Sequence, residues 1–350
     1  MRESVRPTQK CWSITVAKAL RATVAILTYN GETYLREILD AVLAQEHIDG
    51  PFEVLVIDSG STDSTLDIIR SFPSVRLHEI PNSEFGHGRT RNLAAQLAGG
   101  EFVAFLTHDA IPASPRWLAE LLAPFALNPA VQGVVGRQIP RANCVPTLRY
   151  DIIHTFATLG PKLGTTLYRY DPSVFAESDL DALSFYSDVN SAARRSFLVD
   201  VIPYRDVPYA EDQLFGKDLL VAGHIKAYSA RAAVIHSNDL TLHEFGRRII
   251  DETVGLRRIG LPVQQVSVPG AAVRMVKGTL GDTLRLVRDD GYSLPQKVKW
   301  LFVNPWFQWR KWSSIYRGQH IRLDDVARFE SKSLEHTRRR KHEKAARQAD

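Results

Sequence analysis

The sequence has few cysteines and no long apolar run. Its 350 residues include only Cys11 and Cys144, which lie too far apart to suggest a disulfide framework or a metal-binding knuckle. We therefore expect a reducing, cytoplasmic setting. No stretch approaches the ~20 apolar residues that span a bilayer. Residues 1–21 lack the apolar centre and cleavage site of a secretory signal, and we expect them to form an N-terminal tail.

Glycine-rich phosphate motifs are also missing. No Gly-x-Gly-x-x-Gly turn follows the first predicted strand, and no Gly-Lys-Ser/Thr sequence occurs. Gly86-x-Gly88 precedes a predicted helix but is weak evidence for a phosphate nest. A nucleoside diphosphate would therefore be neutralised by a metal ion on Asp109 or by arginines such as Arg89 and Arg91, and one carboxylate is chemically sufficient for Mg²⁺.

What is present is typical of a globular protein, with 44% hydrophobic and 24% charged residues. The net charge of +5 is concentrated near the end of the chain. Residues 296–317 hold five basic side chains, no acid and four of the six tryptophans, and Arg338-Arg-Arg-Lys341 follows. This basic region indicates nucleic acid or phospholipid as a partner, or a solvated tail.

Strands and helices alternate through the first third of the chain. Apolar, β-branched runs predict strands at 23–28, 52–57, 75–80 and 102–106, and helices are predicted between them. This order is the signature of a doubly wound α/β domain with a mostly parallel sheet.

Polar residues stand where three of these strands end, namely Asn30, Asp58 and Asp109. Ligands and metals bind at the carboxyl edge of such sheets. Asp109 alone is equally well interpreted as a cap of the following turn. The three together favour a binding site, because otherwise three independent caps are needed.

These motifs resemble a known family. Thr28-Tyr-Asn30, Val56-Ile-Asp58-Ser-Gly-Ser-Thr-Asp63 and Thr107-His-Asp109 are similar to the family-2 inverting glycosyltransferases of GT-A fold. Phe85-Gly-His-Gly-Arg-Thr-Arg-Asn92 is similar to the rhamnosyltransferase-like branch of bacterial surface polysaccharide synthesis. The resemblance covers residues 23–251. It implies that Asp58, with Thr28 and Asn30, binds the pyrimidine base of the donor, and that Asp109 is the metal-binding acid. Thr107 stands where the family usually has a further acid.

The second half carries the remaining candidate residues. Residues 137–181 look irregular and predict a flap over the donor. The resemblance places Asp188 and Asn190 beside the donor sugar. Glu211 and Asp212 begin a predicted helix, where the helix dipole accounts for one acid; the resemblance makes Asp212 the general base and Glu211 a donor-site residue. His236 ends a predicted strand and is either structural or, by resemblance, a second metal ligand.

Beyond residue 261 the resemblance fades. Trp309, Trp312 and Tyr316 fall on one helical stripe with basic neighbours. Core packing or dimerisation explains such a stripe, and so does a helix lying in a bilayer interface.

The sequence thus predicts a tail (1–21), a GT-A glycosyltransferase domain (22–260) with a nucleotide-binding half (22–136) and an acceptor and catalytic half (137–260), and a helical basic extension (261–350). The predicted reaction transfers a sugar, with L-rhamnose from dTDP-L-rhamnose as the best hypothesis, using Mg²⁺ or Mn²⁺. The predicted acceptor is a saccharide on a polyprenyl diphosphate, reached by a cytoplasmic enzyme attached peripherally to the inner face of the membrane. Homodimer formation is also predicted. The alternatives are a nucleic-acid-binding protein, which would need a recognition motif inside the core, or a nucleotidyltransferase, which would need a basic glycine-rich loop after the first strand.

Overall fold

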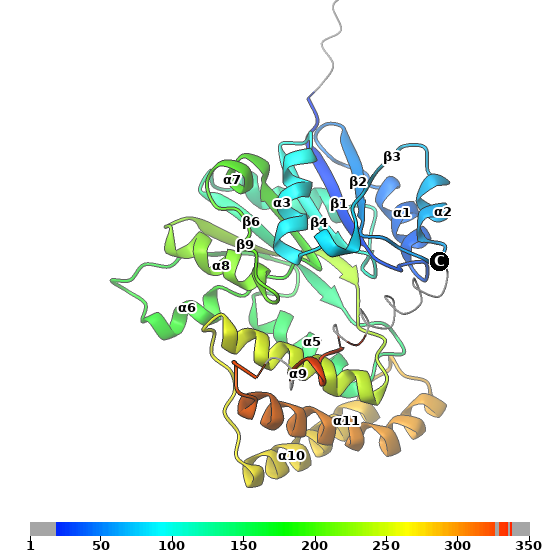
Figure 1. Cartoon of the computed structure of the whole chain (residues 1–350), viewed down its shortest axis with the longest axis vertical. Coiled ribbons are helices and arrows are strands. Elements are labelled where there is room, and N and C mark those ends of the chain that lie inside the picture. The colour runs from blue at the N-terminus through cyan, green and yellow to red at the C-terminus, as the bar shows by residue number, and fades with distance from the viewer. Residues whose placement is uncertain (1–18, 326–328, 335–336, 338–350) are drawn as a thin grey trace, which may run out of the picture.

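The computed structural model describes residues 19–325, 329–334 and 337 (Figure 1). Cys11, most of the predicted tail and the basic run 338–341 lie outside these residues. Within the described residues, nine strands form one sheet: β1 (Ala22–Thr28), β2 (Phe52–Asp58), β3 (Val75–Glu79), β4 (Phe102–Thr107), β5 (Ile111–Pro112), β6 (Val131–Ile139), β7 (Thr165–Tyr168), β8 (Asn190–Arg194) and β9 (Ile225–Ile235).

The α-helices cover the sheet and extend beyond it. Their bounds are α1 (Leu35–Leu43), α2 (Thr65–Arg70), α3 (His87–Leu97), α4 (Trp117–Leu122), α5 (Pro146–Thr158), α6 (Glu177–Leu183), α7 (Arg195–Asp200), α8 (Glu211–Val221), α9 (Leu242–Arg258), α10 (Val268–Arg288) and α11 (Leu294–His320). Two short 3₁₀ helices are η1 (Asn82–Glu84) and η2 (Ala123–Ala126).

The strand order β3-β2-β1-β4-β8-β6-β9-β5 brings the early strand ends to one edge, and β7 pairs with β9. Strands β1 to β4 are parallel, and Thr28 aligns with Asp58. Every antiparallel pairing involves a strand after β4. The carboxyl ends of β1, β2 and β4 therefore meet at a common rim, as the polar strand ends predict.

Alternation along the central strands builds two cores. Val24, Ile26, Val54 and Val56 face the cluster that includes α1 and α4. Their neighbours along the strands face the opposite cluster, which includes α3, α7 and α8. Successive strand residues point to opposite faces, so a strand without polar positions is buried on both sides. The predicted doubly wound sheet is confirmed.

The segment 137–181 is more regular than its sequence indicates. It ends β6 and forms α5, β7 and most of α6. Its helix α5 has a weakly amphipathic sequence because one side packs against the C-terminal extension and not only against the sheet. Thr147 of α5 donates a hydrogen bond to Asn304 Oδ1 of α11 at 2.8 Å.

The C-terminal extension is helical, as predicted. Helices α10 and α11 pack against each other, and α11 also packs along α9 and against α5 (Figure 1). Asp282 of α10 is buried and accepts hydrogen bonds from Asn304 and Gln308 of α11. No helix among the described residues is both long and apolar enough to cross a bilayer.

Candidate active site

The side chain of Asp58 ties β1 to the loop after β2. It is fully buried and accepts hydrogen bonds from Thr28 Oγ1 (2.8 Å), Ser61 Oγ (2.5 Å) and the backbone N–H groups of Gly60 and Ser61. Hydrogen bonds from these four donors offset the free-energy cost of burying the carboxylate. The predicted base-binding pair, Asp58 and Thr28, therefore meets at the rim and holds residues 59–61 in place.

Asn30 braces the same loop from the β1 side. Its backbone has φ 49°, a left-handed conformation that Asn tolerates better than most residues. Its amide oxygen accepts from Thr62 N–H at 2.8 Å, and its own N–H donates to Ser61 Oγ at 2.9 Å. The structure thus brings Thr28, Asn30 and Asp58 together in one network.

Asp109 and His236 face each other across the rim. They follow β4 and β9, and the pairing of β5 with β9 brings them together. His236 Nε2 lies 3.4 Å from Asp109 Oδ2, and the Asp109 side chain is 28% exposed. Burial acts to raise the pKa of Asp109, but the neighbouring His236, and then His108 and Thr107, outweigh it and hold the pKa well below its usual range.

Gln138 of β6 orients the His236 ring. His236 Nδ1 lies 3.0 Å from Gln138 Oε1, and the Gln138 amide nitrogen donates to Ser187 Oγ at 3.1 Å. This arrangement puts the Nδ1 proton on the Gln138 side and directs Nε2 at Asp109. One imidazole nitrogen and one carboxylate oxygen are a donor set that fits Mn²⁺.

A second acidic cluster lies beside this pair and is filled by an arginine. Asp188, Glu211 and Asp212 have carboxylate oxygens within 4.8 Å of one another. Arg91 of α3 is 7% exposed and inserts here, with Nε 2.9 Å from Asp188 Oδ2 and an ion pair from Nη1 to Glu211. Because the guanidinium pairs with both of these acids, their carboxylate oxygens are already engaged and are not offered to a metal.

Asp212 is the acid that Arg91 does not pair with. Its carboxylate accepts from the N–H of Asp188 at 3.3 Å and of Gln213 at 2.8 Å. Burial, then the charges of Glu211 and Asp188, raise the pKa of Asp212 to about 8, against the opposing charge of Arg91. A carboxylate with a pKa near the working pH is suited to general base catalysis.

One short segment joins the two sites. Thr107 N–H lies 3.5 Å from Val189 O, next to the Asp109 loop, and the adjacent Asp188 contacts Asp212 as above. Asn190 begins β8 but is fully buried, and its amide binds Trp117 Nε1 and the carbonyls of Arg137 and Ala232. The Asn190 side chain thus links β8 to α4, β6 and β9 inside the protein.

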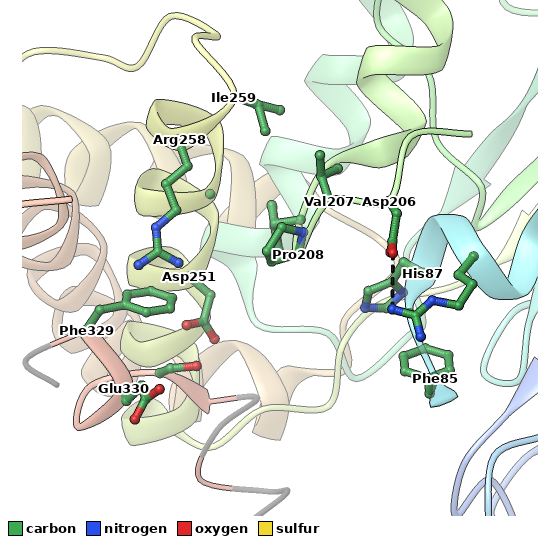
Figure 2. A pocket seen from close by; sticks show the side chains of 15 residues that line it. Phe85, His87, Asp206, Val207, Pro208, Asp251, Arg258, Ile259, Phe329 and Glu330 are labelled. Carbon is green, nitrogen blue, oxygen red and sulfur yellow. Dashed lines mark hydrogen bonds and ion pairs between the residues drawn. The ribbon is translucent and has the colours of Figure 1, made fainter. Parts of the chain in front are cut away.

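A cavity of about 430 Å³ opens beside the start of α8 (Figure 2). The N-terminus of α3, loop 206–209, α9 and residues 329–333 form its walls. Arg89 bonds Asp206 here at 3.1 Å, with each side chain 57% exposed, so this predicted donor-site arginine lies apart from Arg91. Aromatic rings and carboxylates both line the space, including Phe85, His87, Phe329, Asp206 and Glu330. Loop 206–209 leads directly into Glu211 and Asp212.

Comparison with known proteins decides the family. The model of glycosyl transferase family 2 matches residues 23–201, more than half of the chain. The chain belongs to glycosyl transferase family 2. The enzyme is therefore a glycosyltransferase, as predicted, and neither the nucleic-acid-binding alternative nor the nucleotidyltransferase alternative is needed.

Relatives of this family-2 glycosyltransferase include two from Salmonella. The chain is 30% identical over 241 residues to an O-antigen chain rhamnosyltransferase of Salmonella typhimurium, covering 67% of this chain and 72% of that protein. It is also 30% identical over 240 residues to an O-antigen chain rhamnosyltransferase of Salmonella anatum, covering 66% and 71%. The predicted resemblance to the rhamnosyltransferase-like branch is thus confirmed.

The fold has a solved counterpart. A mannosyltransferase from Pyrobaculum calidifontis, in complex with GDP-Man and Mn²⁺, superposes with a TM-score of 0.53 at 18% identity and covers 89% of this chain and 90% of that chain. At this identity the likeness shows the shared fold, and the predicted GT-A architecture is confirmed.

Sequence reasoning did not find two residues that shape the glycosyltransferase site. Gln138 orients His236, and Arg141 donates from Nη2 to the Asp109 backbone carbonyl at 2.5 Å while its guanidinium lies 3.9 Å from the Tyr34 ring centroid. Both follow from the parallel pairing of β6 with β9, which the local sequence does not reveal.

Proposed function

We propose that this glycosyltransferase inverts the anomeric centre and transfers L-rhamnose from dTDP-L-rhamnose to a saccharide in bacterial cell-surface polysaccharide synthesis. The O-antigen rhamnosyltransferases of Salmonella support the choice of sugar and pathway class. One observation carries the mechanism: a metal-type pair, Asp109 and His236, and a carboxylate of raised pKa, Asp212, flank the same segment, residues 187–190.

The metal in this proposal is Mg²⁺ or Mn²⁺ held by Asp109 and His236. When bound, the cation supplies positive charge where the departing nucleoside diphosphate develops negative charge. Gln138 fixes the imidazole so that Nε2 faces the metal position. The test is to measure donor binding with and without Mg²⁺ or Mn²⁺. The Asp109→Ala variant should lose the metal dependence, whereas the matched control Asp40→Ala, at an exposed position of α1, should keep it.

Asp212 takes the proton from the acceptor hydroxyl in this proposal. Glu211 and Asp188 do not compete for the role, because each is held by the Arg91 guanidinium. The donor-contacting roles predicted for Arg91, Glu211, Asp188 and Asn190 stay predictions. Asp188 also has a structural part, because its backbone N–H donates to Asp212 and its carboxylate pairs with Arg91.

The donor base would bind at the rim formed by Thr28, Asn30 and Asp58. The hydrogen bonds of Asp58 to residues 60 and 61 support a preformed pocket wall there. The nucleotide-binding half is then residues 22–136. The acceptor and catalytic half, 137–260, contributes Asp188, Asp212 and His236.

The acceptor saccharide would enter through the cavity beside loop 206–209. Saccharides bind through aromatic faces and hydrogen bonds to charged side chains, and this cavity presents both. The acceptor is proposed to be linked to a polyprenyl diphosphate, with the enzyme in the cytoplasm and attached peripherally through residues 261–350. Homodimer formation stays a prediction.

A nucleotide-sugar panel tests the proposal. Thermal unfolding is followed with dTDP-L-rhamnose, dTDP-D-glucose, UDP-GlcNAc and GDP-mannose, each with and without Mn²⁺. We expect the largest rise in Tm with dTDP-L-rhamnose plus Mn²⁺, because a ligand that binds only the folded state stabilises it by mass action. Stabilisation by GDP-mannose alone would reject the donor assignment, and no response to Mn²⁺ would reject the metal.

A further inference from the structure

The outer side of α10 is apolar although it faces solvent. Val273, Val276, Leu280, Leu284 and Val287 recur every three or four residues, and each side chain is more than half exposed. The buried residues of this helix, Asp282 and Leu286, lie on the other side. Solvent-facing sides of helices are normally polar, so an apolar stripe there calls for a partner.

Helix α11 repeats the pattern with larger side chains. Leu294, Val298, Phe302, Trp306 and Trp309 form its outer stripe; Phe302 is 74% and Trp306 60% exposed. The Trp306 and Trp309 rings meet edge to face at 6.4 Å. The buried side, which includes Trp300 and Phe307, packs into the protein. We call these ten residues of α10 and α11 the hairpin surface.

This surface differs from the aromatic stripe predicted from the sequence. Only Trp309 belongs to both. Trp312 lies under Arg274 of α10, with the guanidinium carbon 5.3 Å from its ring centroid, and the tilted rings of Tyr316 and His320 have centroids 4.3 Å apart. The exposed apolar residues are therefore identified by their solvent exposure in the structure, and the spacing of aromatic residues in the sequence does not predict them.

The two helices carry an excess of positive charge, although Lys311 pairs with Asp151 of α5 and Arg285 with Asp282. Helix α10 carries four basic residues and α11 carries five, whereas their only acid is Asp282, which is 3% exposed. The connecting turn adds Asp289, which Arg149 neutralises at 2.8 Å, and Asp290. Apolar and tryptophan side chains flanked by lysine and arginine are the composition of helices that lie in the interface of an anionic bilayer.

We propose that the hairpin surface docks on an anionic phospholipid leaflet. The proposal deepens the proposed function and rests on it for the lipid-linked acceptor. Neither helix is apolar enough to span the bilayer, which agrees with docking on the surface. A second copy of the chain is the less favourable occupant, because a two-fold interface brings the same basic flanks together.

Helix α9 connects the hairpin to the cavity beside loop 206–209. Arg257 of α9 donates to the carbonyls of Gly318 and Ile321, at 2.8 and 2.7 Å, which ties α9 to the end of α11. Asp251 and Arg258 of the same α9 line the cavity (Figure 2). The same helix therefore contacts both the hairpin and the cavity proposed for the acceptor.

Vesicle co-sedimentation of the full chain tests the docking. The probes are vesicles of phosphatidylcholine alone and vesicles containing about one-third phosphatidylglycerol. We expect binding to the anionic vesicles that weakens as salt rises. Phe302→Glu with Trp306→Glu should reduce the partition coefficient more than about tenfold, since two anchors are removed and two negative charges added.

The matched control places the same charges elsewhere. Leu127→Glu with Val221→Glu changes two side chains that are 62% and 61% exposed beyond η2 and at the end of α8. This control should bind vesicles as the wild type does. Equal loss in both double variants, or no binding of the wild type to anionic vesicles, would overturn the proposal.

Two further measurements separate the remaining outcomes. Sedimentation velocity without lipid should show the same oligomeric state for the wild type and for Phe302→Glu with Trp306→Glu. If the wild type is a dimer and this double variant is a monomer, a second copy of the chain occupies the hairpin surface and lipid docking is refuted. Thermal stabilisation by dTDP-L-rhamnose should be equal in both proteins. Vesicle binding without any nucleotide-sugar binding would reject the proposed function and leave the docking surface standing.

Discussion

Two arginines, two residues apart on α3, have different environments. Arg91 is buried between Asp188 and Glu211, whereas Arg89 and its partner Asp206 are each 57% exposed. Burying a charge is tolerated only when it is paired and hydrogen-bonded, and removing one partner leaves the others uncompensated. An exposed pair is screened by water and contributes little.

Substitutions of the two arginines should therefore lower the free energy of unfolding by different amounts. We expect Arg91→Met to lower the free energy of unfolding by about 3–5 kcal/mol, and Arg89→Met to lower it by at most about 1 kcal/mol. Urea unfolding measures both. Similar losses in the two variants would contradict the buried ion-pair network.

Asp212 is expected to act as the general base. Asp212→Asn should reduce kcat by about 10²–10⁴-fold, the usual contribution of such a group, while dTDP-L-rhamnose still raises Tm. Asp218→Asn is the matched control, because Asp218 lies on the same helix and pairs with Arg205 at the surface. Turnover of Asp212→Asn within a few-fold of wild type would exclude Asp212 as the base.

The raised pKa of Asp212 also predicts a pH dependence. Since the base acts as the carboxylate, kcat/KM should rise with pH and level off above about pH 8. The free energy of unfolding should change in the opposite direction. The folded protein keeps the Asp212 proton up to about pH 8, whereas the unfolded chain loses it near pH 3.9. The free energy of unfolding therefore falls as pH rises between these values. In Asp212→Asn this part of the stability slope should vanish. An unchanged slope would contradict the raised pKa.

Residues at strand ends were predictable, and long-range partners were not. Thr28, Asn30, Asp58 and Asp109 follow apolar strands, so the alternation of strands and helices places them on one rim. The partner of Arg91 could not be read from its surroundings, because Glu211 lies 120 residues away in the chain. The basic residues near Arg91 in the sequence suggested a diphosphate-binding site instead.

At the scale of elements, packing between distant segments decided what the sequence left open. Helix α5 looks irregular alone because Thr147, Asn304 and Asp282 complete its buried side. The outer stripe of α11 is recognisable only once α9 and α10 cover its other sides. Local periodicity therefore predicted the sheet well and the extension only as helical.

The cavity walls give a prediction at this scale. Phe85, at the entry to α3, makes an edge-to-face contact with His87 at 5.0 Å and lines the cavity. If the cavity binds the acceptor, Phe85→Leu should raise the acceptor KM several-fold, because a stacking face worth about 1 kcal/mol is lost. The donor KM should not change. Phe72→Leu, half-buried beside Arg36 and away from the cavity, is the control. Equal effects of the two substitutions on the acceptor KM would reject the cavity as the acceptor site.

At the scale of the whole molecule, the sheet and the C-terminal hairpin lie at opposite ends, with α9 between them (Figure 1). Residues of α9 also line the cavity. This arrangement suits the proposed reaction, in which a nucleotide sugar binds at one end and a lipid-linked acceptor approaches from the other. The proposed catalytic groups come from both predicted halves of the glycosyltransferase domain, so the proposed site requires β9 and α8 to join the first four strands.

The location of the metal tests this account most directly. Crystals grown with MnCl₂ and dTDP are measured at the manganese absorption edge, so that anomalous scattering locates the ion. We predict one peak between Asp109 and His236, in contact with the diphosphate. A peak among Asp188, Glu211 and Asp212, where Arg91 now lies, or diphosphate bound without manganese, would contradict the account.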